Sequence, residues 1–147
     1  MDYYDLPADQ AFLISLKSLI RHTDKLLVLR IAGTADQWEL PGGLLEMGEK
    51  PIDGLLREVR EETGLNVAVE QIIAVWDNPV DGFVVRDGRT LNVCVILIGY
   101  LCSTAETAVT LSDEHDNFRW VSNSEISELH LAANTDEAIQ AYLRLSL

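Results

Sequence analysis

The stretch GLLEMGEKPIDGLLREVREETGL, residues 43–65, decides the fold of this chain. Its first third is rich in glycine and polar residues, and the rest has the composition of a helix. Pro51 suits the first position of a helix, and Gly64 suits the residue just beyond a helix end. The stretch therefore predicts a loop that leads into a helix of about 13 residues, from 51 to 63.

Three carboxylates on this helix share one side. Glu58, Glu61 and Glu62 follow the spacing i, i+3, i+4, which places them within an arc of roughly 100°. Like charges so close destabilise an isolated helix, so a bound cation is the natural reason for them. Carboxylate oxygens without a nearby Cys or His favour Mg²⁺ over zinc. We expect the opposite arc to be buried; it holds Ile52, Leu56, Val59 and Thr63.

The residues before the helix read WELPGG, 38–43, and end in two glycines. A glycine has no Cβ, so its backbone can approach an ion or a pyrophosphate closely. We expect Gly42 and Gly43 to face such a group.

The stretch 43–65 resembles the Nudix box, G-x5-E-x7-R-E-U-x-E-E-x-G-U with U aliphatic, at every specified position. The matching residues are Gly43, Glu49, Arg57, Glu58, Val59, Glu61, Glu62, Gly64 and Leu65. The chain is thus similar to the Nudix (MutT-like) hydrolases. The resemblance implies an α/β protein with the Nudix fold, an α/β/α sandwich around a mixed β-sheet, and a single Nudix domain over residues 1–147.

The resemblance also implies roles for the box residues. Mg²⁺, or alternatively Mn²⁺, would be held by the carboxylates of Glu58, Glu61 and Glu62 and by the Gly42 carbonyl. Arg57 would support the catalytic site by pairing with Glu49. One glutamate would remove a proton from a metal-activated water, and which one stays open.

Two further segments carry candidates outside the box. The segment LSDEHDNFRW, 111–120, resembles a Nudix loop in which an acidic residue completes the metal site or acts as general base. Glu114 is the candidate, and a solvated loop acid is the alternative. His115 could share proton transfer or stack on a base. Arg30 is a candidate for substrate binding together with Gly43, against the alternative of a solvated arginine at a strand end.

The expected reaction is Mg²⁺-dependent hydrolysis of a nucleoside diphosphate linked to another group, such as a (deoxy)nucleoside triphosphate. ADP-ribose or a sugar nucleotide is the alternative substrate. A non-catalytic module that senses a nucleotide is a third reading, disfavoured because all the box glutamates are present.

Composition restricts the partners. Lys and Arg number 11 against 24 Asp and Glu, so the net charge is −13. Such a charge repels nucleic acid and anionic membranes. The small nucleotide expected as the partner is what the family resemblance implies. The acidic N-terminus differs from a signal peptide, and Cys94 and Cys102 read as buried thiols, so we expect a cytoplasmic protein. Dimers are common among such relatives, and a homodimer stays an open expectation.

The rest of the chain predicts strands and two further helices. We expect strands at 11–20, 25–31, 66–75, 83–85 and 91–102, with a break at residues 76–79 and an Asp-Gly type I′ hairpin turn at residues 86–89. A short helix is expected at 124–129 and a last helix at 136–145, capped by Asn134 or Thr135. The last helix should pack on the sheet face opposite the 51–63 helix.

Overall fold

The computed structural model describes residues 7–132 and 135–145. The helices in these ranges are α1 Pro51–Thr63, α2 Asn123–Ile126 and α3 Asp136–Leu143. The strands are β1 Gln10–His22, β2 Lys25–Ile31, β3 Trp38–Glu39, β4 Gly42–Leu44, β5 Ala68–Val84, β6 Thr90–Ser103 and β7 His115–Val121.

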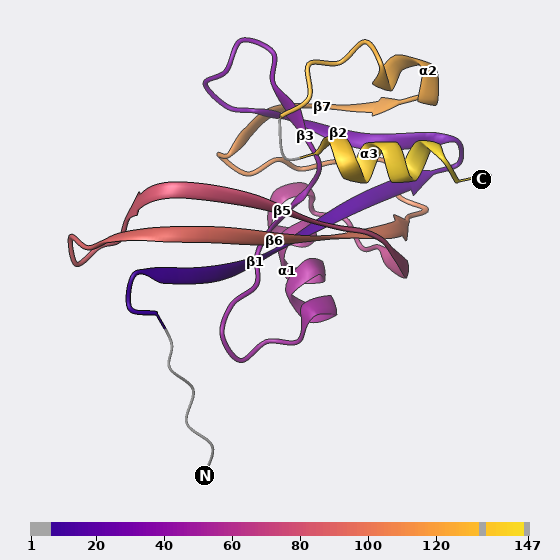
Figure 1. Ribbon diagram of the computed structural model, residues 1–147. Coiled ribbons are helices and arrows are strands. Elements are labelled where there is room, and N and C mark those ends of the chain that lie inside the picture. The colour runs from indigo at the N-terminus through magenta and orange to yellow at the C-terminus, as the bar shows by residue number, and fades with distance from the viewer. Residues whose placement is uncertain (1–6, 133–134, 146–147) are drawn as a thin grey trace.

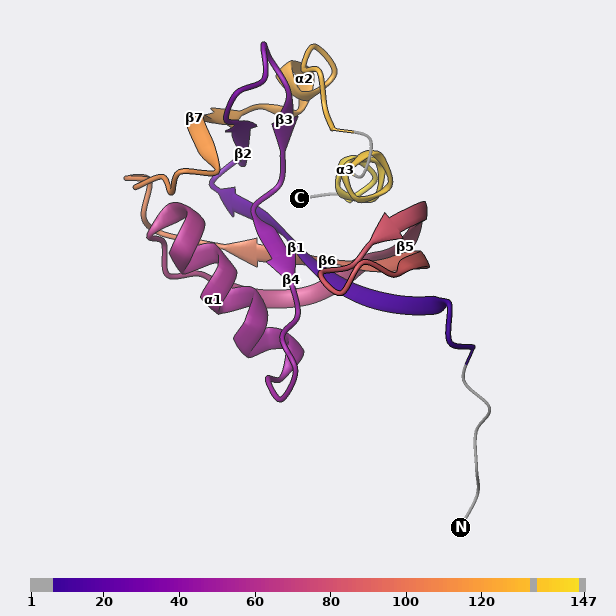
Figure 2. The same ribbon diagram turned by 90° about the vertical axis from the view of Figure 1, so that its left-hand side faces the viewer.

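All of these strands join one mixed sheet in the order β3-β2-β1-β6-β5, with β4 paired to β1 and β7 paired to β2. The β1–β6 pair is parallel, and the other pairs are antiparallel. Helix α1 covers one face of the sheet and α3 the other (Figure 1; Figure 2). The expected α/β/α sandwich, with the last helix opposite the 51–63 helix, is confirmed.

Each helix packs on its own hydrophobic core. Side chains alternate between the two faces along a strand. On β2, Leu26 and Val28 therefore face the core under α3, while Leu27 and Leu29 face the core under α1. All four are fully buried, so both faces of β2 are covered.

Helix α1 begins and ends where the sequence predicts. Pro51 is its first residue, and Gly64 follows it with φ +71° in the left-handed conformation. The buried face differs from the expected arc, because Ile52 is 48% exposed. Val59 and Thr63 are buried as expected, and they are joined by Leu55 and Glu62, so the carboxylate of Glu62 points into the protein.

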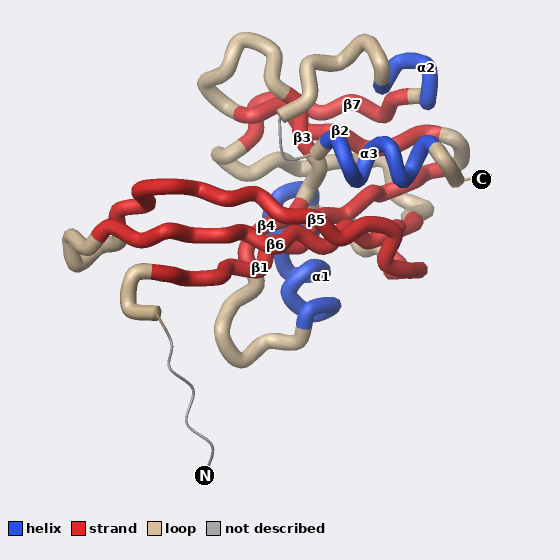
Figure 3. Tube along the Cα trace, in the orientation of Figure 1, coloured by secondary structure: helices blue, strands red, loops and turns tan. Residues whose placement is uncertain are grey.

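The predicted break at residues 76–79 is wrong, since β5 runs through it as one long strand. Figure 3 shows β5 and β6 as an extended hairpin. Strand β5 lies at the sheet edge, where Pro79 needs no partner for the N–H it lacks, and three register shifts accommodate its irregular sequence.

The hairpin turn itself also differs from the prediction. Gly88 has φ +85°, while Asp87 is not in the positive-φ region. A type I′ turn needs positive φ at both central residues, so this is a type I turn followed by a left-handed glycine.

The C-terminal helices are shorter than expected. Helix α2 begins one residue early, with Ser122 as its cap, and α3 ends at Leu143 rather than at residue 145. Thr135 precedes α3 as expected, whereas Asn134 lies outside the described residues.

Candidate metal and active site

The first part of the site is built where β4 meets β1 and α1. The register pairs Gly42 with Lys17 on β1, and the Gly42 N–H donates to a carboxylate oxygen of Glu62 at 2.9 Å. A Cβ on Gly42 would lie 2.0 Å from the Leu16 carbonyl oxygen. Only glycine allows this approach, which brings the loop backbone onto the carboxylates of α1.

The next residue provides space for a second carboxylate. A Cβ on Gly43 would lie 2.5–2.6 Å from the carboxyl group of Glu58. The Glu58 carboxylate therefore occupies the space that any other side chain at 43 would need.

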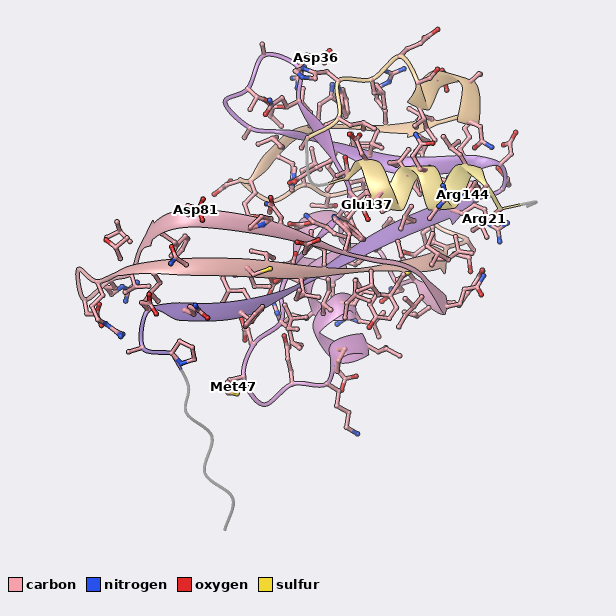
Figure 4. All side chains as sticks on the ribbon, in the orientation of Figure 1. Arg21, Asp36, Met47, Asp81, Glu137 and Arg144 are labelled. Carbon is pink, nitrogen blue, oxygen red and sulfur yellow. The ribbon has the colours of Figure 1, made fainter. Side chains whose placement is uncertain are left out.

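Arg57 ties the loop to the helix. Its guanidinium donates to both oxygens of Glu49, at 3.1 and 2.8 Å, and to Glu58 at 2.9 Å. It also reaches the Leu44 carbonyl at 3.3 Å and Glu61 at 3.3 Å. The expected Arg57–Glu49 pair is present, and the hydrogen bonds to Arg57 lower the pKa of Glu49. Figure 4 shows Met47, in the same loop, pointing out to solvent, so the loop turns Glu49 inward and Met47 outward.

Glu62 is the most unusual acid of the site. It is only 4% exposed, and burial raises its pKa to about 8, although the Gly42 N–H, His115 and Lys17 oppose the shift. Among the described residues no lysine or arginine forms an ion pair with it within 4 Å. A buried carboxylate without a paired cation binds a proton or a metal ion.

Two residues from the start of β7 complete this part of the site. One oxygen each of Glu62 and Glu114 and one ring nitrogen of His115 all lie within 4.8 Å of one another. Glu114 is exposed and His115 is buried, so the group lies between the protein interior and solvent.

Two residues that have no predicted role support His115. Its Nε2 lies 2.7 Å from an oxygen of Glu39, and Lys17 Nζ lies 3.7 Å from the other Glu39 oxygen. Burial works against a charged imidazole, but Glu39, Glu62 and Glu114 together raise the pKa of His115. The sequence offers one signal for this pair, because Lys17 is a charged residue inside the apolar run of β1. Glu39 has no signal of its own beyond its place in the segment WELPGG.

The remaining candidates lie further out. Glu61 is 58% exposed, and among the described residues its ion-pair partner is Arg57. Arg30, at the end of β2, donates to Asp116 at 2.6 Å and so points at the β7 loop beside His115. The structure thus gathers Glu62, Glu114 and His115 and joins Glu58 to the glycine loop. Glu61 is exposed on α1, and Arg30 is paired with Asp116 on β7.

These residues fit a divalent cation. The donors are mainly carboxylate oxygens, which hard cations prefer. Two features of the described residues are explained by such an ion. The buried Glu62 carboxylate has no lysine or arginine within ion-pair distance, and a buried ring nitrogen of His115 has no hydrogen-bond partner. Glu58, Glu61 and Glu62, with Glu114, are the residues that would hold it.

Fold and site together define the class of protein. The sequence matches the family model of the NUDIX domain over residues 17–143. The chain belongs to the Nudix hydrolase family, which acts on pyrophosphate bonds.

Individual relatives agree with this class. A MutT-like protein of Streptomyces ambofaciens is 32% identical over 75% of this chain, and the chain spans 63% of its length. The nucleoside triphosphatase NudI of Klebsiella pneumoniae is 34% identical over 67% of this chain and 71% of that protein.

Solved structures agree as well. A MutT protein from Methanosarcina mazei Go1 is 26% identical, with a TM-score of 0.71 and coverage of 94% and 95% of the two chains. The E. coli ORF135 protein, 22% identical, has the same fold with a TM-score of 0.71 over 95% and 94%. Within the described residues, none of the helices has the length and apolar character needed to cross a membrane.

Proposed function

We propose that this chain is a Mg²⁺-dependent pyrophosphohydrolase of nucleoside triphosphates, acting as a single Nudix domain. The observation that carries the proposal is the buried Glu62 carboxylate, which lies beside Glu114 and His115 and is held by the Gly42 N–H. The names of two kinds of relative, nucleoside triphosphatase and MutT-like protein, support the choice of substrate.

A bound divalent cation supplies charge neutralisation on the phosphates and lowers the pKa of water, so that hydrolysis can proceed at neutral pH. The chain's own residues then have separable tasks. Glu62 and Glu58 provide fixed negative charge, Glu58 in the space left by Gly43 and Glu62 through its hydrogen bond from Gly42.

Glu114 is the general base that we favour. It is exposed to solvent, and its carboxylate lies within 4.8 Å of the Glu62 carboxylate, so it can accept a proton from an attacking water. Proton removal by a positioned side chain contributes roughly 10²–10⁴-fold to the rate of such a reaction. Glu61 is the alternative, since it too is exposed.

Arg57 orients the carboxylates rather than contacting the substrate, because its donors are directed at Glu49, Glu58 and Glu61. Arg30 offers positive charge at the edge of the site if substrate phosphate displaces Asp116. The cytoplasmic location and a homodimer remain predictions of the sequence.

The test is a panel of nucleoside triphosphates, ADP-ribose and sugar nucleotides, each incubated with the protein with and without Mg²⁺. We expect Mg²⁺-dependent conversion of at least one triphosphate to monophosphate and pyrophosphate. Faster cleavage of ADP-ribose or a sugar nucleotide would make that compound, rather than a nucleoside triphosphate, the substrate class. Thermal stabilisation by nucleotides without any cleavage would indicate a sensor.

A further inference from the structure

The imidazole of His115 has one ring nitrogen that no described residue explains. The side chain is 1% exposed, and its Nδ1 is buried without a hydrogen-bond partner. A buried polar atom without a partner lowers the stability of the folded state, so a folded protein rarely keeps one that has no ligand.

The other ring nitrogen is firmly engaged. A carboxylate can only accept, so the 2.7 Å contact between Nε2 and Glu39 places a proton on Nε2. Lys17, which is 6% exposed, lies 3.7 Å from the other Glu39 oxygen and so stabilises the charged form of this carboxylate. In the neutral imidazole this leaves the lone pair on Nδ1 free. Histidines that bind metals commonly have this arrangement, donating the remote N–H to a carboxylate.

The surroundings of His115 match that arrangement. One ring nitrogen of His115 and one oxygen each of Glu62 and Glu114 lie within 4.8 Å of one another, and Nδ1 is the ring nitrogen that Glu39 leaves available. A cation with bonds of about 2.1 Å holds its ligands roughly 3 to 4 Å apart, so side-chain adjustments would bring these three atoms onto one ion.

We propose that Nδ1 of His115 is a nitrogen ligand of the cation held by Glu62 and Glu114, and that it shifts the preference of the site from Mg²⁺ toward Mn²⁺. Mg²⁺ prefers oxygen ligands, whereas imidazole suits transition metals. The proposal rests on the proposed function only in that Glu62 and Glu114 bind a cation. Glu39 and Lys17 are positioning residues, which fix the tautomer and orientation of the ring.

The direct test is electron spin echo spectroscopy of the Mn²⁺-loaded protein, which detects nitrogen bound to Mn²⁺. We expect a nitrogen coupling in the wild-type protein that changes to the ¹⁵N pattern when histidine is ¹⁵N-labelled. Absence of that coupling in the loaded wild-type protein overturns the proposal, and this measurement needs no variant to fold.

Affinities give the second test. His115→Gln should weaken Mn²⁺ binding at least about tenfold and Mg²⁺ binding less than about threefold, and Glu39→Gln should have a smaller effect of the same kind. His22→Gln is the matched control, since His22 is half-buried and bonded through Nδ1 to the Thr104 carbonyl instead. An unchanged ratio of the two affinities in folded His115→Gln also overturns the proposal.

Glu62→Gln separates the two claims. If it abolishes binding of both metals while Mn²⁺ in the wild-type protein shows no nitrogen, the function stands and the His115 ligand is wrong. If the wild-type protein binds neither metal, the proposed function fails, and the His115 ligand fails with it.

Discussion

Glu62 carries a carboxylate into a buried position where, in the part of the chain that the structure describes, no lysine or arginine lies within ion-pair distance. At 4% exposure its charge is poorly hydrated, and its pKa rises to about 8. The native metal-free protein therefore binds a proton there that the unfolded chain, with an ordinary carboxyl, has released at neutral pH. The buried Glu62 carboxylate therefore lowers the stability of the metal-free protein and at the same time favours binding of a cation.

This shift predicts a pH-dependent effect of Glu62→Gln on stability in chelator. Because the folded pKa is raised, stability falls as pH rises from about 4.5 to about 8, by on the order of 4 kcal/mol. The variant lacks this loss, so it should unfold at a higher temperature than wild type at pH 8 and near the wild-type temperature at pH 5. Calorimetric melts at both pH values measure this. The exposed Glu128→Gln is the control, and equal shifts at both pH values would contradict the assignment.

Gly43→Ala should separate activity from stability. The added methyl meets the carboxyl end of Glu58, a flexible group that can move aside, so unfolding should change by less than about 1 kcal/mol. The displaced carboxylate should lower kcat by roughly 10–100-fold, since small misplacements near the chemistry are costly. Steady-state kinetics measure the expected loss of kcat, and thermal melts measure the expected small change in stability.

Gly33→Ala is the control for Gly43→Ala. A Cβ at Gly33 meets nothing within 4 Å, and φ is +76° there, so this variant should lose some stability and keep its kcat. Equal kinetics in the two variants would mean that the position of Glu58 does not matter.

At the scale of elements, the loop at 45–50 and helix α1 act as one unit through Arg57. Its fork bonds both oxygens of Glu49, and lysine cannot reproduce that geometry. Arg57→Lys should lower stability by about 1 kcal/mol and kcat about tenfold, because the partly exposed pair contributes little to folding but positions Glu58.

The control for Arg57→Lys is Arg60→Lys, an exposed residue on the same helix. A double-mutant cycle with Glu49→Gln measures the coupling of the pair. Additive effects of the two changes would show that the loop and helix are independent.

The sequence predicts local elements well and long-range neighbours poorly. Helix α1 follows from Pro51, Gly64 and the residues between them, and all of these signals lie within one segment. The sequence predicts a break at residues 76–79, which include Pro79. A proline is tolerated within a strand at the edge of a sheet, and only the topology shows that β5 is such an edge strand.

The same limit applies to the site. The box residues are close in sequence, and the sequence analysis named them. Glu39 and His115 are 76 residues apart and meet only because β3 and β7 both pair with β2. The expected burial of Val59 and Thr63 on α1 is confirmed, but spacing alone did not show that Glu62 points inward and Ile52 outward.

For the whole molecule, a net charge of −13 acts on folding and on binding in opposite directions. Salt screens repulsion among the acids, and it also screens their attraction for Mg²⁺. Raising NaCl from about 20 to about 200 mM should raise the melting temperature of the metal-free protein and weaken Mg²⁺ binding severalfold. Melts and calorimetric titrations at both salt concentrations check this. A Mg²⁺ binding constant that is the same at both concentrations would contradict it.

The most direct test of the account is the rate of Mg²⁺-dependent nucleoside triphosphate hydrolysis by Glu62→Gln, measured beside wild type. We predict a loss of at least about 100-fold in a variant that remains folded and melts no lower than wild type at pH 8. A folded Glu62→Gln protein that hydrolyses the substrate within about twofold of the wild-type rate would contradict it, since a buried carboxylate that holds the cation cannot be dispensable.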